Sequence, residues 1–147
     1  MPTLPWTTPN PATAGTEALV MASRFELHSL RDVPRFFLKS LAVWRQLRTA
    51  PGALGGSLIA QPLKRTFYTL SAWESRETLN AFAGAQPHRS TMTSLRSTMK
   101  TSTFTFWEVP VEQLPIPWAE ARTRLARAAS EKAASEQAAT QDAPRPA

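Results

Sequence analysis

The order of strand-like and helix-like patterns constrains the fold of this chain more than any other feature of its sequence. Stretches with the alternation of a β-strand and stretches with helical spacing follow one another as strand, helix, strand, strand, helix, strand. The strands are predicted at 17–27, 53–61, 65–73 and 101–109, and the helices at 32–50 and 76–99 with an interruption at 84–87. This is the split-βαβ order, in which two helices cover one face of an antiparallel sheet. We therefore predict an α+β domain of ferredoxin-like topology over residues 17–110.

Caps and breaks at the expected boundaries support this order. Asp32 and Ser75 can cap the two helices, and Pro51-Gly52 ends the first of them. The pair Gly55-Gly56 weakens the interior of the second strand, which indicates a bulge there or the close approach of another segment.

The segments on either side of this domain carry little that a core could bury. Residues 1–16 contain four prolines and are predicted to form an extended arm, in which Trp6 indicates a docking contact, for example over a partner's pocket. Residues 111–137 are predicted to form a linker and a C-terminal helix that frays beyond Leu125, since only alanines follow as apolar helix residues. We expect residues 138–147 to be a disordered tail.

Both faces of the predicted sheet are apolar. The larger side chains, such as Phe25 and Phe67, share one face. The other face carries Val20, Ala22, Tyr68, Leu70, Trp107 and Val109. Since burying one large apolar side chain is worth about 1.5–3 kcal/mol, leaving such a patch in water would be unusual for a monomer. We therefore expect a second, identical subunit to cover the face that the helices leave free, which gives a homodimeric α/β barrel.

Composition excludes several classes of function. The 147 residues include no cysteine, which excludes disulfides and thiolate catalysis, and two histidines, His28 and His88, which argues against a zinc site within one subunit. No apolar run is long enough for a membrane helix and the N-terminus lacks a secretory signal, so we expect a cytoplasmic protein without a membrane partner. The net charge of +6 comes from scattered basic residues, so nucleic acid is not expected as a partner.

Four runs of the sequence carry a family resemblance. They are RTAPGALGGSLIA (48–60), FYTLSAWESRETLNAFA (67–83), PHRSTM (87–92) and FTFWEV (104–109). Their specific features are Pro51-Gly52 before the second strand, Trp73 with an acidic residue next to it, and His88 at the start of the last helical segment. With these features the chain resembles the antibiotic-biosynthesis-monooxygenase-like superfamily of dimeric α/β barrels, and within it a bacterial branch distantly similar to spheroidene monooxygenase-like proteins.

The resemblance implies a range of activities. Members of the superfamily include cofactor-free monooxygenases that oxidise polyketide phenols, haem-degrading oxygenases, dismutases, decarboxylases and cyclases. The first expectation is a homodimeric enzyme of the monooxygenase or cyclase type, without a cofactor, acting on an apolar substrate of the kind found in secondary metabolism. A haem-binding oxygenase is the second possibility. A non-catalytic dimer with a binding or structural role is the third, because a fold does not fix a reaction.

His88 is the first candidate for a catalytic residue. The positive end of a helix dipole favours the neutral imidazole, which can act as a general base or bind a substrate by a hydrogen bond. The resemblance implies that a histidine on this helix binds the haem iron in haem-degrading members, near a tryptophan that Trp73 could match. The spacing of these two residues is longer than expected for that group, and a structural role for either stays open.

The remaining candidates are basic or aromatic residues on the strands and helices. Arg24 or Arg65 could hold a carboxylate, phenolate or enolate, and Tyr68 could bind a substrate carbonyl, because their strands should face the cavity. The predicted catalytic residues are thus His88, Arg24 and Tyr68, and the predicted substrate-binding residues are Trp73, Arg65, Trp44, Phe67 and Met92. Salt bridges at the rim and roles in the core are the alternatives.

Overall fold

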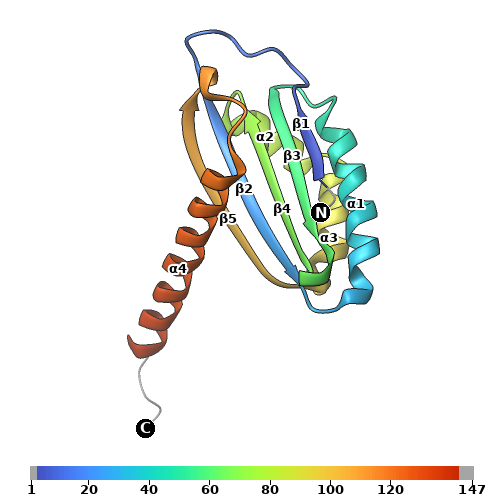
Figure 1. Ribbon diagram of the computed structural model, residues 1–147, viewed down its shortest axis with the longest axis vertical. Helices are drawn as coiled ribbons and strands as arrows, with labels where there is room; N and C mark the ends of the chain where they lie inside the picture. Colours follow the sequence, from blue (N-terminus) through green and yellow to red (C-terminus); the bar gives the residue numbers. More distant parts are fainter. Residues whose placement is uncertain (1–2, 143–147) are drawn as a thin grey trace.

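The computed structural model describes residues 3–142 as a five-stranded antiparallel sheet with three helices on one face and a fourth helix across the other (Figure 1). The strands are β1 (Thr3–Thr7), β2 (Glu17–Leu27), β3 (Ala53–Gln61), β4 (Thr66–Trp73) and β5 (Met99–Pro110), in the spatial order β1-β3-β4-β2-β5. The helices are α1 (Val33–Leu47), α2 (Arg76–Gly84), α3 (His88–Leu95) and α4 (Trp118–Asp142). The succession from β2 to β5 is the ferredoxin-like arrangement, so the predicted α+β fold class is confirmed.

Local signals set the ends of the helices largely as predicted. The Ser75 hydroxyl accepts the Thr78 N–H at 3.2 Å and the Thr78 hydroxyl accepts the Ser75 N–H at 3.2 Å, which forms a capping box at the start of α2. Asp32 precedes α1, but its side chain makes no capping hydrogen bond. The Ser29 hydroxyl instead caps the short 3₁₀ turn that leads into α1.

The pair Gly55-Gly56 lies where side chains approach the backbone of β3 closely. A Cβ atom on Gly55 would overlap the indole of Trp6, and one on Gly56 would overlap the end of the Leu47 side chain. The register of β3 against β4 also shifts between Ala53 and Gly55. The structure therefore confirms both features that the glycine pair indicated.

The N-terminal arm differs from its prediction, because residues 3–7 form a strand of the sheet. β1 pairs antiparallel with β3, and the Ser57 hydroxyl donates a hydrogen bond to the Leu4 carbonyl at 2.8 Å. Pro5 is compatible with this strand because β1 lies at the edge of the sheet. Trp6 packs over Gly55, so the docking contact expected for its indole is made with β3 of its own chain.

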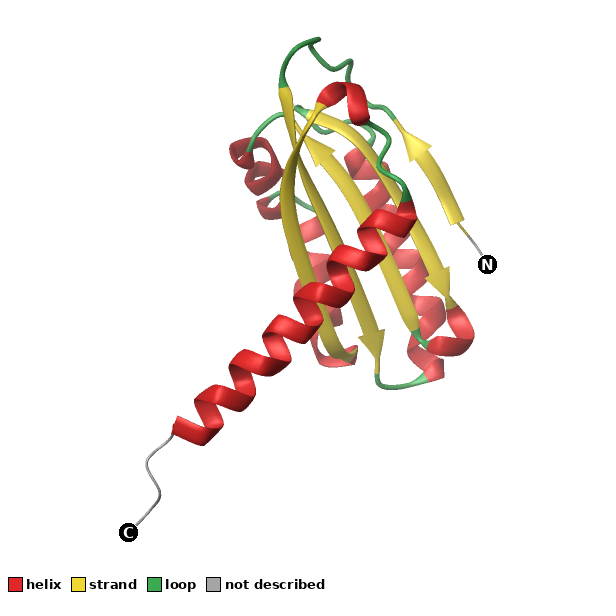
Figure 2. Cartoon of the chain, turned by 60° about the vertical axis from the view of Figure 1, so that its left-hand side comes forward, coloured by secondary structure: helices red, strands yellow, loops and turns green. Residues whose placement is uncertain are grey.

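The face away from α1, α2 and α3 is covered from within the chain. The first turns of α4 and the segment before it bury Ile116, Ala121 and Leu125 in one cluster with Val20 and Leu70 of the sheet (Figure 2). The premise that only a second subunit could cover this face is therefore wrong. It failed because the large apolar residues of the C-terminal segment are few, yet they fall together over the sheet.

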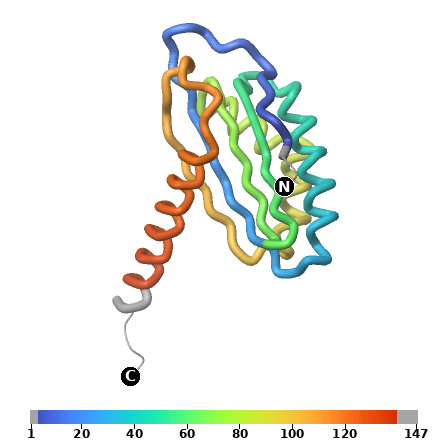
Figure 3. The backbone as a smooth tube through the Cα atoms, in the orientation of Figure 1, coloured from blue at the N-terminus to red at the C-terminus, as the bar shows by residue number. Residues whose placement is uncertain are grey.

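The outer part of α4 extends away from the sheet (Figure 3). The helix continues to Asp142, and residues 131–139 are exposed. The tail predicted at 138–147 is thus helical as far as 142, and its last part lies outside the described residues. Over residues 3–142, no helix combines the length and the apolar character that crossing a bilayer requires.

Candidate functional site

A cavity of about 290 Å³ lies between the sheet and the helices α1, α2 and α3. It is bounded at both ends by aromatic side chains. At one end Phe36 packs against Phe25 and Phe67, with ring centroids 5.8 and 4.5 Å apart. At the other end Trp73 packs against Phe82, with centroids 4.9 Å apart. These two aromatic clusters act as spacers, because their bulk holds the helices away from the strands between them.

Small hydroxyl residues form the floor of the cavity between the clusters. Ser23, Thr69 and Ser71 line it from β2 and β4, and we call them the hydroxyl belt. Ser23 pairs with Thr69 across the two strands, and their hydroxyls are hydrogen-bonded to each other. The Ser71 hydroxyl accepts the indole N–H of Trp73 at 2.9 Å. The small side chains of the hydroxyl belt thus leave open space. Their hydroxyls are hydrogen-bonded mainly to one another and to Trp73, so the cavity stays apolar.

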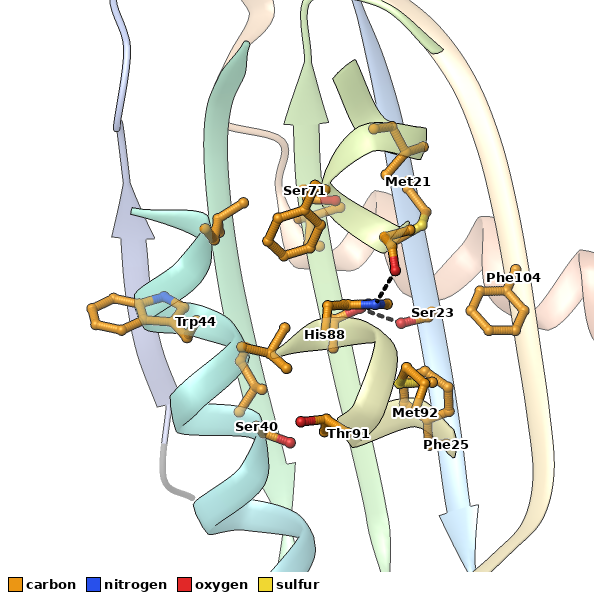
Figure 4. Close-up of a pocket in the computed structure, with 18 of the residues that line it drawn as sticks. Met21, Ser23, Phe25, Ser40, Trp44, Ser71, His88, Thr91, Met92 and Phe104 are labelled. Atoms are coloured by element: carbon orange, nitrogen blue, oxygen red, sulfur yellow. Dashed lines mark hydrogen bonds between the residues drawn. The ribbon is translucent and has the colours of Figure 1, made fainter. Parts of the chain in front are cut away.

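The cavity opens between α2 and β5. Its exposed lining residues are Arg76 and Asn80 on α2 and Phe104 and Phe106 on β5, while the rest of the lining is buried or half-buried. β5 is one of the two edge strands of the sheet, and Phe104 stands on it apart from the helices (Figure 4). A ligand would therefore enter past these four side chains.

His88 begins α3 and lines the cavity, half-buried (Figure 4). Its Nδ1 lies 3.1 Å from the Ala83 carbonyl oxygen. Because a carbonyl only accepts, Nδ1 carries the proton in the neutral ring, and Nε2 keeps a lone pair with no hydrogen-bond partner among residues 3–142. Burial lowers the pKa of His88 below its ordinary value, and the bond to Ala83 offsets this only in part. The lowered pKa favours the neutral imidazole of His88 at pH 7.

Gln46 of α1 fixes the backbone around His88. Its side-chain oxygen accepts the His88 N–H at 2.8 Å, and its side-chain nitrogen donates to the Phe82 carbonyl at 3.1 Å. One amide thus joins the end of α2 to the start of α3, where helix ends would otherwise leave unpaired groups. Gln46 could not be found from the sequence, because a polar residue on a helix gives no sign of such a distant contact.

Thr91 lies three residues after His88 on the same face of α3. Its side chain is buried and lines the cavity, and its hydroxyl has no hydrogen-bond partner in the described part of the chain. A hydroxyl in this position can donate to an oxygen atom of a ligand. The sequence analysis missed it too, although the helical spacing from His88 was a signal that could have found it.

Three of the residues predicted from sequence line the cavity, and two others bound it. His88, Trp44 and Met92 belong to the lining. Phe67 and Trp73 are fully buried in the two aromatic clusters and do not reach the cavity surface. Their roles toward a ligand stay predictions.

Arg24, Tyr68 and Arg65 lie elsewhere, contrary to their predicted position. Arg24 and Tyr68 pair with each other across β2 and β4 on the α4 side of the sheet, where the Tyr68 ring lies 6.4 Å from that of Trp118. Arg24 also forms an ion pair with Glu26 at 3.8 Å. Arg65 occupies a left-handed turn with φ of 54° and donates to the His28 carbonyl at 3.1 Å. The prediction failed because strand alternation separates two faces but does not tell which one the helices cover.

The residues present offer little to a metal or a haem. No group of three or more histidine, aspartate, glutamate or cysteine side chains is placed to hold a metal ion within residues 3–142. His88 Nε2 could ligate an iron, since its other ring nitrogen binds a carbonyl as metal-bound histidines commonly do. However, the cavity volume is at the lower limit for drug-sized ligands, and a haem is larger than these. The cavity therefore fits a haem poorly.

Comparison with solved structures identifies the fold. SnoaB, a cofactor-independent oxygenase from Streptomyces nogalater, is 14% identical, with a TM-score of 0.52 over 63% of this chain and 92% of its own. A protein of Nitrosomonas europaea provisionally described as an antibiotic biosynthesis monooxygenase is 10% identical (TM-score 0.55; 66% and 93% covered). Rv0793 from Mycobacterium tuberculosis is 12% identical (TM-score 0.56; 61% and 92% covered). At these identities the likeness establishes the fold alone.

Sequence comparison assigns the family. No curated protein is significantly similar to the chain in sequence. The model of the family DUF3291, described as a domain of unknown function, matches residues 36–147, which is most of the chain. The chain is therefore a member of the DUF3291 family, and its fold is that of the antibiotic-biosynthesis-monooxygenase-like proteins.

Proposed function

We propose that this protein is an enzyme of the monooxygenase type that takes up an apolar small molecule and uses His88 as its general base. One observation carries the proposal. A neutral imidazole with an unpartnered Nε2 lines a cavity whose surface is otherwise mainly apolar. A base in an apolar cavity is suited to removing a proton from an acidic substrate, because the cavity shields both groups from water. SnoaB, with the same fold, is a cofactor-independent oxygenase, which supports this reaction class.

The step assigned to His88 is the removal of a proton from an acidic C–H or phenol group of the substrate. Nε2 takes the proton, and the electron pair stays on the substrate as a carbanion or phenolate. With O₂ as the co-substrate, a CH₂ group of the substrate becomes a carbonyl group. One oxygen atom forms the carbonyl, the other leaves as water with the two hydrogens, and all four electrons come from the substrate.

Thr91 is the residue proposed to stabilise the charge that this step creates. Its free hydroxyl lies one helical turn from His88, inside a cavity that offers few other donors. A donor aimed at a developing oxyanion is worth more in an apolar site than in water. This role replaces the one that the sequence analysis gave to Arg24 and Arg65, since neither lines the cavity.

Oxygen uptake in the presence of an anthrone tests the proposal, because the methylene group of an anthrone is acidic and its product is a ketone. His88→Gln should lower the turnover by about 10²-fold or more. The activity of the wild type should fall only below the ordinary titration range of histidine, because the pKa of His88 is lowered. His28→Gln is the control, since His28 is exposed and lies outside the cavity lining.

Two results would contradict the proposal. Unchanged oxygen uptake in His88→Gln would remove the base. Tight binding of the anthrone without uptake would instead favour a non-catalytic binding protein, the alternative that the same cavity supports.

We also propose that the protein acts as a homodimer. The outer part of α4 extends away from the sheet with residues 131–139 exposed, and a helix without extensive tertiary packing is only marginally stable in water. A second copy would give this helix a surface to pack on. Sedimentation of the full chain over a range of concentrations tests this, and a monomer at every concentration would exclude it.

A further inference from the structure

The mouth of the cavity holds one cation, Arg76, in the first turn of α2. Its guanidinium carbon lies 4.3 Å from the centre of the Phe106 ring on β5, so the side chain reaches across the opening. Phe106 is 40% exposed, which leaves the contact open to solvent. A guanidinium stacked on a ring in this way still presents its N–H donors at its edge.

Within the described residues the fold gives Arg76 a stacking contact with Phe106 but no partner for its charge. Arg76 forms no ion pair within residues 3–142. It makes no hydrogen bond there either. A cation in the first turn also opposes the helix dipole, so Arg76 does not serve the stability of α2. Its free donors point to a role toward a ligand.

Resting on the proposed function of the cavity, we propose that its substrate is an amphiphile: an apolar, ring-containing body fills the cavity and a carboxylate at one end binds Arg76 at the mouth. The apolar walls and the hydroxyl belt accept the body, and the guanidinium fork matches a carboxylate in a bidentate manner. Arg76 is then a specificity residue and not part of the proton transfer, which takes place at His88.

Three carboxylates near the mouth set the strength of this interaction. Glu74 and Glu77 flank Arg76 in sequence, and Glu108 follows Phe106 on the same face of β5 by strand alternation. None of them lies within ion-pair distance of Arg76. They repel an anion at longer range, so the expected preference for a carboxylate is modest and depends on ionic strength.

Binding of two matched fluorescent probes to the full-length protein tests the proposal. The probes are anthracene carboxylate and anthracene methanol, which share their rings and differ in the charge of the end group. Fluorescence anisotropy should show that the wild type binds the carboxylate about five- to tenfold more tightly than the alcohol at low salt. Arg76→Gln should abolish this preference, so that the carboxylate and the alcohol bind about equally, and Arg76→Lys should retain part of it.

Arg45→Gln is the matched control, because it removes the same charge from an exposed helix position outside the cavity lining. It should keep the preference, and equal melting temperatures should show that all variants are folded. A wild type that binds both probes equally well would overturn the assignment of Arg76 while leaving the cavity function intact. The same preference in Arg76→Gln would overturn it too. Failure of both probes to bind the wild type would overturn the proposed function and the inference together.

Discussion

Helices cover both faces of the sheet but pack on them differently: one face encloses a cavity, and on the other the first turns of α4 lie directly on the strands. On the α4 face the strands present small side chains, Ala18, Ala22 and Ala72, which allow Ala121 and Leu125 to pack directly on the sheet. On the cavity face large aromatic residues stand at the ends and hydroxyl residues stand between them. The helices α1, α2 and α3 pack against the aromatic clusters, which keep these helices from packing directly on the hydroxyl belt.

This difference teaches that the distribution of side-chain size, and not overall apolarity, decides where a site forms. Small residues at the point where a helix crosses the strands let the helix lie directly on the sheet. Large residues at two points keep helices away from everything between those points. Substitutions of the large residues that hold the helices away from the sheet should therefore lower the unfolding free energy strongly. Substitutions on the two faces should differ in the size of this effect.

The largest effect is expected for Trp73→Ala, which removes a fully buried support of the cavity. The loss of a buried tryptophan costs about 3–5 kcal/mol of unfolding free energy. Urea denaturation would measure it. Trp107→Ala is the comparison on the other face, where the half-buried ring should cost about 1 kcal/mol. Similar losses of unfolding free energy in Trp73→Ala and Trp107→Ala would show that Trp73 does not support the cavity face more than Trp107 supports the other face.

Leu125→Ala tests the closely packed face. Leu125 is 1% exposed on the side of α4 that faces the sheet, and its truncation should cost about 2–4 kcal/mol and loosen the helix from the sheet. Thermal unfolding together with binding of a hydrophobic dye would report both changes. Leu38→Ala, at a leucine that is 66% exposed, should change the stability by less than about 0.5 kcal/mol. A native-like stability of Leu125→Ala would mean that α4 does not close this face.

Gly55→Ala probes the edge where β1 meets the sheet. The added methyl group would overlap the Trp6 indole, so we expect a loss of about 1–3 kcal/mol. Combining it with Trp6→Ala should remove the overlap, so that the double variant loses less than the sum of the single variants. Additive losses in a double-mutant cycle would contradict the contact.

The smallest effect is the pH dependence that His88 gives to stability. Its pKa is lowered in the folded state by burial, so the unfolded chain binds more protons between the lowered value and the ordinary value of 6.5. The unfolding free energy should therefore decrease as the pH falls through this window. His88→Asn should flatten that part of the curve, and an unchanged slope would exclude His88 as its source.

Much of the fold could be predicted from the sequence, whereas the site could be predicted only in part. Periodicity gave the order of the elements, and the position of His88 at a helix start followed from Pro87 and the break before it. Arg24 and Tyr68 were predicted to face the cavity but lie on the α4 face. Strand alternation separates the two faces of a sheet without showing which of them the helices α1, α2 and α3 cover. The roles of Gln46 and Thr91 depend on contacts between distant helices, which no local pattern records.

The hydroxyl belt has a consequence for how such a protein can change over time. Its three residues shape the space for a ligand, while the aromatic clusters on either side hold the architecture together. Replacing Ser23 or Thr69 by a larger or smaller residue would reshape the cavity without removing a hydrogen bond of the aromatic clusters, whereas the Ser71 hydroxyl also binds the indole of Trp73. Proteins that share an ancestor can thus come to bind new ligands through single substitutions and stay folded.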